Sequence, residues 1–388
     1  MVYGIIGWDM DSSSKKIIVL TDFDSTGSGY RSICAPLLTK LAEMGYDIKV
    51  AGLMYRGDEH NYPFSIIPAN TLQEATGIVQ NLMHIWYPDL IIVAMDIPVQ
   101  NNLYNQLAQF KKPYIAITPL ENGPLTMSWA IPLFNMDKVF FISELGKQEA
   151  LKVGMKNVEH LQIGIDTVLW HPATQEEKEK LREGLGIPQD AFVVLTVADN
   201  QERKNLWAGL EAISRLKKEI DKPLRYIVVT REQNPYGYKL RDLVKDLDIK
   251  NEYICFERGI PQKDLWGLYA ISDVYLQPSK AEGLGLPVMD AMACGIPVVA
   301  TDTGALHELL ENRGWLIPAE YSFRDVWGNS KRDMISIDKL KDALYALSLL
   351  GKSPLPTSIP LEYIQSRTWD IPAQQLDTAI KEILDVKE

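Results

Sequence analysis

The sequence is poor in the residues that build metal sites and disulfide frameworks. It contains three cysteines and five histidines in 388 residues. Cys34, Cys255 and Cys294 stand far apart, and none belongs to a CxxC pair, so we expect reduced and mostly buried thiols. The histidines form no pair at the spacing of a zinc site. These shortages predict a chain with no disulfide framework and no protein-bound metal.

Surplus positive charge and long apolar runs are missing as well. The formal net charge is −11, and neither half of the chain is basic. This balance argues against non-specific nucleic-acid binding and against strong attraction to anionic lipid. The apolar runs are all shorter than the ~18 residues of a membrane span, and the first residues have the wrong order for an export signal. We therefore expect a cytoplasmic protein with no membrane span and no nucleic-acid partner.

What the chain does contain is a repeated alternation of strand and helix patterns. The apolar run "KKIIVLTDF" (15–23) predicts a buried parallel strand, and "SICAPLLTKLAEMG" (32–45) predicts a helix that stops at a glycine. A segment without periodicity (163–177) resembles a linker, and the alternation resumes at "FVVLTVAD" (192–199). The pattern predicts an α/β fold with two Rossmann-like, doubly wound parallel-sheet domains that face a cleft.

The same pattern suggests domain boundaries. We expect an N-terminal Rossmann-like domain (1–165) and a C-terminal Rossmann-like domain (166–355). The last residues (356–388) are expected to form helices that pack back on the N-terminal domain. Within the second domain, residues 319–336 show no clear period and are expected to form a long irregular loop.

The stretch "PSKAEGLGLPVMDAMACGIPVV" (278–299) has the strongest functional pattern. A glycine turn follows a strand and leads into a helix, where free N–H groups and the helix dipole favour an anion such as a diphosphate. Glu282 stands at the turn, and Asp290 lies about two helical turns further on the same face. Two acids beside an anion site can accept hydrogen bonds from the hydroxyls of a sugar and a ribose. The residues expected to present the turn to the donor are Gly283, Leu284, Gly285 and Leu286.

The longer segment "YLQPSKAEGLGLPVMDAMACGIPVVATDTGALHEL" closely resembles the donor-binding signature of retaining glycosyltransferases of family 4, which have the two-Rossmann GT-B fold. In that family the first acid contacts the transferred sugar and the second contacts the ribose. The resemblance therefore assigns the sugar to Glu282 and the ribose to Asp290, which is one methylene shorter than the usual glutamate. It is strongest in the C-terminal domain (166–355), which it implies binds the nucleotide sugar, and weaker in the N-terminal domain (1–165), which it assigns to the acceptor side.

The stretch "VADNQERKNLWAGLEAI" (197–213) holds the expected phosphate clamp. In the resembled family two basic positions here hold the donor phosphates, and Arg203 and Lys204 match the second of them. We expect them in the first turn of a helix (203–219). A plain solvated helix start is the alternative, but cations oppose the dipole there unless an anion is near.

The first basic position of that clamp is absent. Asp199 and Asn200 stand where the family has Gly-Arg, and Arg258 is the candidate to replace the missing arginine. Asn200 and Arg258 are accordingly expected to contact the donor.

Two loops of the first domain complete the expected site. Gly27, Ser28 and Gly29 follow the first strand; the fold implied by the resemblance places such a loop against the diphosphate and the acceptor, whereas a plain turn is the alternative. "ITPLENG" (117–123) resembles a loop where many relatives have histidine, and Glu121 is the nearest ionisable residue. An exposed turn glutamate is the alternative.

The sequence thus predicts a metal-independent, retaining glycosyltransferase that moves a hexose from a nucleoside-diphosphate sugar to a hydroxyl acceptor. No cofactor is expected, and a UDP-sugar is favoured over a GDP-sugar as donor. The acceptor is a sugar, a lipid-linked glycan or a protein. The expected catalytic residues are Glu282, Lys204, Arg203 and Glu121.

The metal expectation rests on the positions of paired acids. The pairs in "DFD" (22–24) and "DMD" (9–11) lie in the first domain, away from the expected donor side.

Two alternatives remain open. One is a nucleotide-sugar epimerase or a phosphorylase on the same scaffold. The other is a non-catalytic nucleotide-sugar binder, which the missing arginine and the shorter Asp290 make conceivable.

Overall fold

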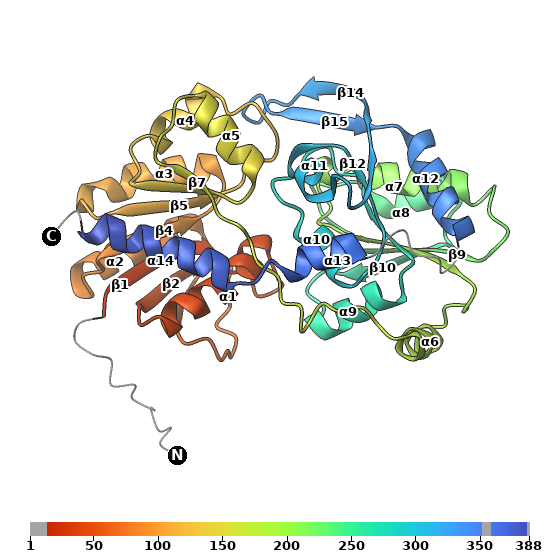
Figure 1. The fold of residues 1–388 in the computed structure, drawn as a ribbon, viewed down its shortest axis with the longest axis horizontal. Coiled ribbons are helices and arrows are strands. Elements are labelled where there is room, and N and C mark those ends of the chain that lie inside the picture. The colour runs from red at the N-terminus through yellow and green to blue at the C-terminus, as the bar shows by residue number, and fades with distance from the viewer. Residues whose placement is uncertain (1–13, 351–357, 386–388) are drawn as a thin grey trace, which may run out of the picture. The chain divides into compact units, whose positions relative to one another are not determined.

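The structure is a computed structural model that describes residues 14–350 and 358–385 (Figure 1). The acids of "DMD" (9–11) lie outside the described residues. The chain forms two compact units. The first contains the residues up to Thr118, Pro132–Phe140 and the residues from Trp369 onward, and the second contains Pro119–Ile131 and Phe141–Thr368. The domain boundaries expected from the sequence stay a prediction.

The first sheet has seven strands in the order β3-β2-β1-β4-β5-β6-β7. The pairs from β3 through β5 are parallel. The strand β4 is buried at every position, as expected for a strand covered on both faces. The strands are β1 (Lys16–Asp22), β2 (Asp47–Leu53), β3 (Ser65–Ala69), β4 (Leu90–Ala94), β5 (Tyr114–Thr118), β6 (Lys138–Phe141) and β7 (Val158–His160).

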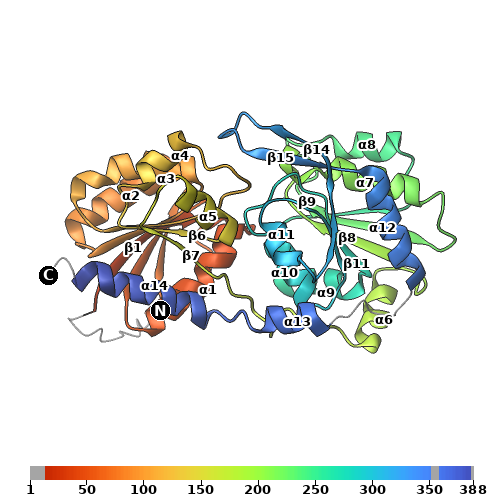
Figure 2. The same cartoon turned by 45° about the horizontal axis from the view of Figure 1, so that its top comes forward.

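Helices cover both faces of this sheet in the first unit, with α1 and α14 on one face and α2 and α3 on the other (Figure 2). The terminal helix α14 is tied to α1 by an ion pair of 3.0 Å between Lys40 and Asp370. The helices of this part of the chain are α1 (Gly29–Glu43), α2 (Leu72–Ile85), α3 (Ile97–Leu107), the 3-10 turn η1 (Ala108–Phe110), α4 (Met127–Leu133), α5 (Glu144–Lys152) and α14 (Asp370–Asp385).

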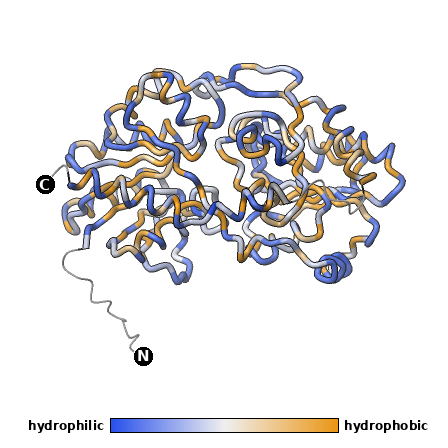
Figure 3. Tube along the Cα trace, viewed as in Figure 1, coloured by the Kyte–Doolittle hydropathy of each residue, from blue (hydrophilic) through white to orange (hydrophobic). Residues whose placement is uncertain are grey.

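The second sheet has six parallel strands in the order β10-β9-β8-β11-β12-β13. Its apolar strands lie in the interior between helix layers, and Figure 3 shows apolar residues gathered along them. The strands are β8 (Phe192–Val197), β9 (Leu224–Thr230), β10 (Tyr253–Glu257), β11 (Val274–Gln277), β12 (Val298–Thr301) and β13 (Trp315–Ile317).

In the second unit, α7 and α12 pack together over one face of the sheet. The helix α13 contacts α10. The helices are α6 (Gln175–Gly184), the 3-10 turn η2 (Glu202–Lys204), α7 (Leu206–Leu216), α8 (Leu240–Asp246), α9 (Gln262–Ile271), α10 (Leu286–Ala293), α11 (Gly304–Leu310), α12 (Ile337–Leu350) and α13 (Ser358–Gln365). The prediction of two doubly wound parallel sheets is confirmed.

The expectation of an irregular loop at residues 319–336 is wrong. The chain forms an antiparallel hairpin there, with β14 (Ala319–Arg324) paired to β15 (Lys331–Ile335). Its turn contains Gly328 and Asn329 with positive φ angles of 65° and 54°. Glycine and asparagine are the residues that tolerate this conformation, so "GN" was the available turn signal.

None of the helices in the described ranges has the length and apolar character that crossing a bilayer requires.

Candidate functional site

The glycine turn after β11 is closely packed within the second unit. Gly285 has φ +95° and caps the start of α10, a conformation that a side chain would strain. A Cβ on Gly304 would collide with the carbonyl oxygens of both Glu121 and Glu282. The turn, the start of α11 and the segment around Glu121 therefore meet at one place.

Glu282 is the centre of this place. Its side chain is 6% exposed, and its Oε1 lies 2.6 Å from Lys204 Nζ. The Ser279 hydroxyl donates to the same oxygen at 2.7 Å, and Gln277 Nε2 donates to it at 2.8 Å. Arg203 Nη1 lies 3.2 Å from Oε2. Burial by itself would raise the pKa of Glu282, but the two cations and the hydroxyl outweigh it and lower the pKa to about 2.

The two cations do not lie in a helix that begins at residue 203, so this prediction is wrong. Arg203 and Lys204 belong to the 3-10 turn η2, and α7 begins only at Leu206. Asn205 separates the two with a left-handed backbone, φ 54°, and its Nδ2 donates to the Pro278 carbonyl at 3.1 Å. The contact with residue 278 holds η2 beside the glycine turn.

Lys204 is therefore an interior cation and not a helix-start cation. Burial lowers its pKa, and the neighbouring Arg203 lowers it further, while Glu282 acts in the opposite direction. Its charge is balanced mainly by one buried carboxylate.

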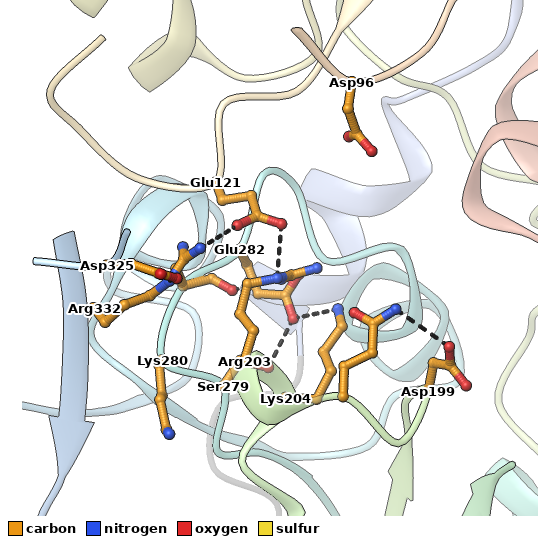
Figure 4. A network of polar contacts seen from close by, with 12 residues as sticks. Asp96, Glu121, Asp199, Arg203, Lys204, Ser279, Lys280, Glu282, Asp325 and Arg332 are labelled. Atoms are coloured by element: carbon orange, nitrogen blue, oxygen red, sulfur yellow. Dashed lines mark hydrogen bonds and ion pairs between the residues drawn. The ribbon is translucent and has the colours of Figure 1, made fainter. Parts of the chain in front are cut away.

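Arg203 extends the ion pairs toward the hairpin. Its Nε lies 2.7 Å from Glu121 Oε1, and Glu121 Oε2 lies 2.9 Å from Arg332 Nη2 on β15. Arg332 Nε lies 2.7 Å from Asp325 Oδ2. Figure 4 shows these side chains pointing toward one another from three separate segments of the second unit. Sequence reasoning missed Arg332 and Asp325, because they stood in the segment expected to be irregular.

Asp199 lies at the other end of the site, beyond Lys204 (Figure 4). Arg231 Nε donates to its Oδ1 at 2.8 Å, and Arg258 Nη1 lies 3.9 Å from its Oδ2. Burial would raise the pKa of Asp199, but these arginines outweigh it and lower the pKa. Arg258, the expected substitute for the missing clamp arginine, thus stands beside an acid.

Asn200 has a different position from the one expected. It is fully buried, its Oδ1 accepts from Tyr238 N at 2.9 Å, and its Nδ2 donates to Tyr238 O at 2.9 Å. Its amide holds a loop of the second unit, and its expected contact with a donor stays a prediction.

Asp290 lies on α10 and is half-buried. Within the part of the chain that the structure describes, its carboxyl group forms no hydrogen bond or ion pair, and burial raises its pKa well above the ordinary value. A carboxyl group can accept hydrogen bonds from hydroxyls. This chemistry suits a ribose diol.

Gly27, Ser28 and Gly29 belong to the first unit. Gly27 has φ +92°, and Gly29 is the first residue of α1. The Ser28 hydroxyl caps α1 by accepting from Arg31 N at 3.1 Å. The loop thus has a structural role, and its expected contact with a donor stays a prediction.

Within residues 14–350 and 358–385, no group of three or more histidine, cysteine, aspartate or glutamate side chains could hold a metal ion.

Residues 177–324 match the family model described as "Glycosyl transferases group 1". The match contains Glu282, Arg203, Lys204 and Asp290. It excludes Glu121 and ends before Arg332.

Curated relatives match the chain over part of its length. One is a GDP-mannose-dependent alpha-(1-6)-phosphatidylinositol monomannoside mannosyltransferase of Mycolicibacterium smegmatis, 31% identical over 43% of this chain and 42% of its own. Another is a D-inositol 3-phosphate glycosyltransferase of Corynebacterium kroppenstedtii, 30% identical over 44% of this chain and 40% of its own. The chain thus spans less than half the length of these two relatives.

Solved structures resemble the chain over nearly its whole length. A glycosyltransferase from Rickettsia africae has a TM-score of 0.73 at 16% identity, covering 96% of this chain and 99% of its own. Anabaena HepE in complex with UDP and glucose has a TM-score of 0.71 at 17% identity, covering 95% of this chain and 100% of its own. At these identities the likeness shows the fold. Together with the family match, it confirms the resemblance that the donor-site residues predicted.

Proposed function

We propose that this chain, which belongs to the group 1 glycosyltransferases through residues 177–324, moves a hexose from a nucleoside-diphosphate sugar to a hydroxyl acceptor with retention of configuration. One observation carries the proposal. The buried Glu282 carboxylate is held between Lys204 and Arg203 at the mouth of a glycine turn that opens α10. This arrangement brings together a carboxylate that can accept hydrogen bonds from sugar hydroxyls, two cations, and the backbone amides at the start of α10.

The cations supply the electrostatic part of the reaction. As the bond between the sugar and the diphosphate breaks, negative charge grows on the leaving phosphate. Lys204 and Arg203, with the amides of residues 283–286, are placed to stabilise that charge. Because the groups are already fixed by hydrogen bonds, little reorganisation is needed during the reaction.

Glu282 orients the transferred sugar by accepting hydrogen bonds from its hydroxyls. Its lowered pKa keeps the carboxylate ionised at neutral pH, so it acts as an acceptor and not as a proton donor. The acceptor hydroxyl attacks on the face of the leaving phosphate, and its proton passes to a phosphate oxygen. The products are the glycosylated acceptor and a nucleoside diphosphate.

Asp290 completes the donor site by binding the ribose. Its carboxyl group lacks a partner within the described residues, which leaves it available for the ribose hydroxyls. The donor contact expected of Gly27, Ser28 and Gly29 stays a prediction.

The nucleotide base and the acceptor are kept open in this proposal. The Mycolicibacterium relative is named as GDP-mannose-dependent, whereas Anabaena HepE was solved with UDP and glucose. The UDP preference expected from the sequence stays a prediction. A glycan or an inositol phosphate is supported as acceptor class by the names of the relatives.

A non-catalytic nucleotide-sugar binder is the second candidate. Asp199 lies in the stretch where the family has a clamp arginine, and it is paired with Arg231 and lies near Arg258. These contacts weaken the positive charge at that end of the site. A binder would take up the sugar nucleotide but show neither transfer nor slow hydrolysis.

Turnover of the parent separates the two candidate functions, and turnover of Glu282→Ala tests the role of Glu282. We expect Glu282→Ala to lower turnover by roughly two orders of magnitude or more, because one oriented contact in the transition state is removed. Hydrolysis of GDP-mannose and UDP-glucose is followed by release of GDP or UDP, with transfer measured on candidate glycan and inositol phosphate acceptors. Glu183→Ala, at an exposed position of α6, is the matched control and should behave like the parent. Near-normal turnover in folded Glu282→Ala would contradict the assigned role, and a parent that binds donor without any turnover would favour the binder.

A further inference from the structure

The hairpin brings to the site an arginine that lies beyond the family match. Arg332 on β15 has a side chain that is 3% exposed. Its Nη2 binds Glu121 at 2.9 Å, and its Nε binds Asp325 at 2.7 Å. Its third nitrogen, Nη1, is buried and has no hydrogen-bond partner among the described residues. Buried polar groups are nearly always satisfied, so an unmatched arginine nitrogen beside a site calls for an explanation.

Glu121 is shared between two arginines. Its Oε1 lies 2.7 Å from Arg203 Nε, and its Oε2 lies 2.9 Å from Arg332 Nη2. Its side chain is 26% exposed, so it has more freedom than Arg332. A diphosphate that approaches Arg203 meets Glu121 as a competing anion.

Two hydrogen bonds tie β15 to the residues that follow Glu121. Lys331 N donates to Gly123 O at 2.9 Å, and the Asn122 side-chain Nδ2 donates to Asp333 Oδ2 at 3.0 Å. Lys331 and Asp333 flank Arg332, so the strand is held on both sides of this arginine. Arg332 therefore stays in place when the Glu121 side chain moves.

We propose that Arg332 is a positioning residue that receives Glu121 when the donor diphosphate binds Arg203. In this exchange Glu121 Oε1 leaves Arg203 Nε and accepts from Arg332 Nη1, while Oε2 keeps Nη2. The result is a two-pronged arginine–carboxylate pair, the strongest geometry available to these groups. Arg332 Nη1, on the hairpin, is thus the hydrogen-bond donor that Glu121 uses after the exchange. The inference rests on the proposed function, because it takes a nucleoside diphosphate as the ligand.

The exchange gives a sharp expectation for Glu121 and Arg332 together. Glu121→Gln removes the competing anion, so it should tighten binding of the bare diphosphate by about fivefold. Arg332→Lys keeps a positive charge but loses the two parallel N–H donors of the guanidinium group. The displaced Glu121 carboxylate can then no longer form the two-pronged pair. We expect diphosphate binding to weaken by about tenfold. In the double variant, Arg332→Lys should change the affinity of Glu121→Gln by less than about twofold.

Calorimetric titration of the full chain with GDP and with UDP measures all four proteins. Arg332→Gln is titrated beside them, and melting temperatures confirm that each variant is folded. Arg324→Gln is the control on the same hairpin, since among the described residues its exposed side chain bonds only the backbone carbonyls of Gly123 and Asn329. It should bind as the parent does.

The outcomes test the exchange separately from the proposed function. If Glu121→Gln restores the diphosphate affinity that Arg332→Lys loses, the exchange is supported. Equal weakening by Arg332→Lys in both backgrounds shows a loss that does not involve Glu121 and overturns the exchange. Parent-like binding by Arg332→Lys beside weak binding by Arg332→Gln shows a simple effect of charge and also overturns it. A parent that binds neither GDP nor UDP contradicts the proposed function itself, and the exchange falls with it.

Discussion

Lys204 and Glu282 form a buried ion pair, with Nζ 2.6 Å from Oε1 and both side chains less than a fifth exposed. The pair joins the turn η2 to the glycine turn, which the chain connects only through many intervening residues. Because it is buried, breaking it has consequences for stability as well as for binding. A cation in the first turn of a helix opposes the dipole when no anion is bound, so at the position expected from the sequence the loss of Lys204 would leave the unliganded protein unchanged or slightly more stable. The observed pairing reverses that expectation.

Lys204→Ala should lower the free energy of unfolding by about 3–5 kcal/mol, because it leaves a buried carboxylate without its main counter-ion. The measurement is urea unfolding of the unliganded protein at neutral pH. Adding Glu282→Gln to Lys204→Ala should recover part of the loss, since the remaining group is then neutral. Lys180→Ala, which breaks an exposed pair with Glu176 on α6, should show no measurable change. A Lys204→Ala protein as stable as the parent would show that the pair does not exist in solution.

The low pKa of Glu282 predicts a dependence of stability on pH. Its folded-state pKa is about 2, below the ordinary value of 4.5. The carboxylate therefore contributes stability that is fully present above about pH 4.5 and is lost as the pH falls toward 2. Glu282→Gln should be less stable than the parent at pH 6, and the difference should shrink steadily over the acid range.

Urea unfolding at several pH values between about 6 and 2.5 checks this slope. Glu183→Gln serves as the control for a general effect of removing one carboxylate, since Glu183 is exposed. A difference between the parent and Glu282→Gln that stays constant with pH would contradict an ionised, buried Glu282.

Chelation of divalent metal tests the source of phosphate stabilisation. Lys204, Arg203 and the helix-start amides are proposed to stabilise the diphosphate. We therefore expect turnover to persist in excess EDTA, at no less than about half of the untreated rate. Complete loss that manganese restores would mean that a metal carries the diphosphate charge and that the cations have another role.

The strand, turn and helix that hold Glu282 could largely be predicted from the sequence, because each depends on residues that are close together in the chain. A buried strand, a glycine turn and a helix start follow one another within residues 274–293, so Glu282 could be placed without a structure. Strand positions were readable for the same reason, since runs such as β4 are apolar throughout.

The ion pairs were not readable, because they depend on contacts between distant segments. Nothing near Glu121 in the sequence indicates that it binds both Arg203 and Arg332. The left-handed Asn205 also broke the expected helix, because its amide is used for the Pro278 carbonyl. In each case a tertiary contact decided the local conformation.

The most direct test of the account is the division of labour between Lys204 and Glu282 in donor binding. Lys204→Ala and Glu282→Gln are titrated by calorimetry with a bare nucleoside diphosphate and with the matching sugar nucleotide, using GDP with GDP-mannose and UDP with UDP-glucose. Lys204→Ala should weaken both members of a pair by about one to two decades, because the lost charge-assisted contact is to the diphosphate. Glu282→Gln should weaken the sugar nucleotide far more than the bare diphosphate. If Lys204→Ala binds the diphosphate as tightly as the parent, or if Glu282→Gln weakens both ligands equally, the proposed donor site is contradicted.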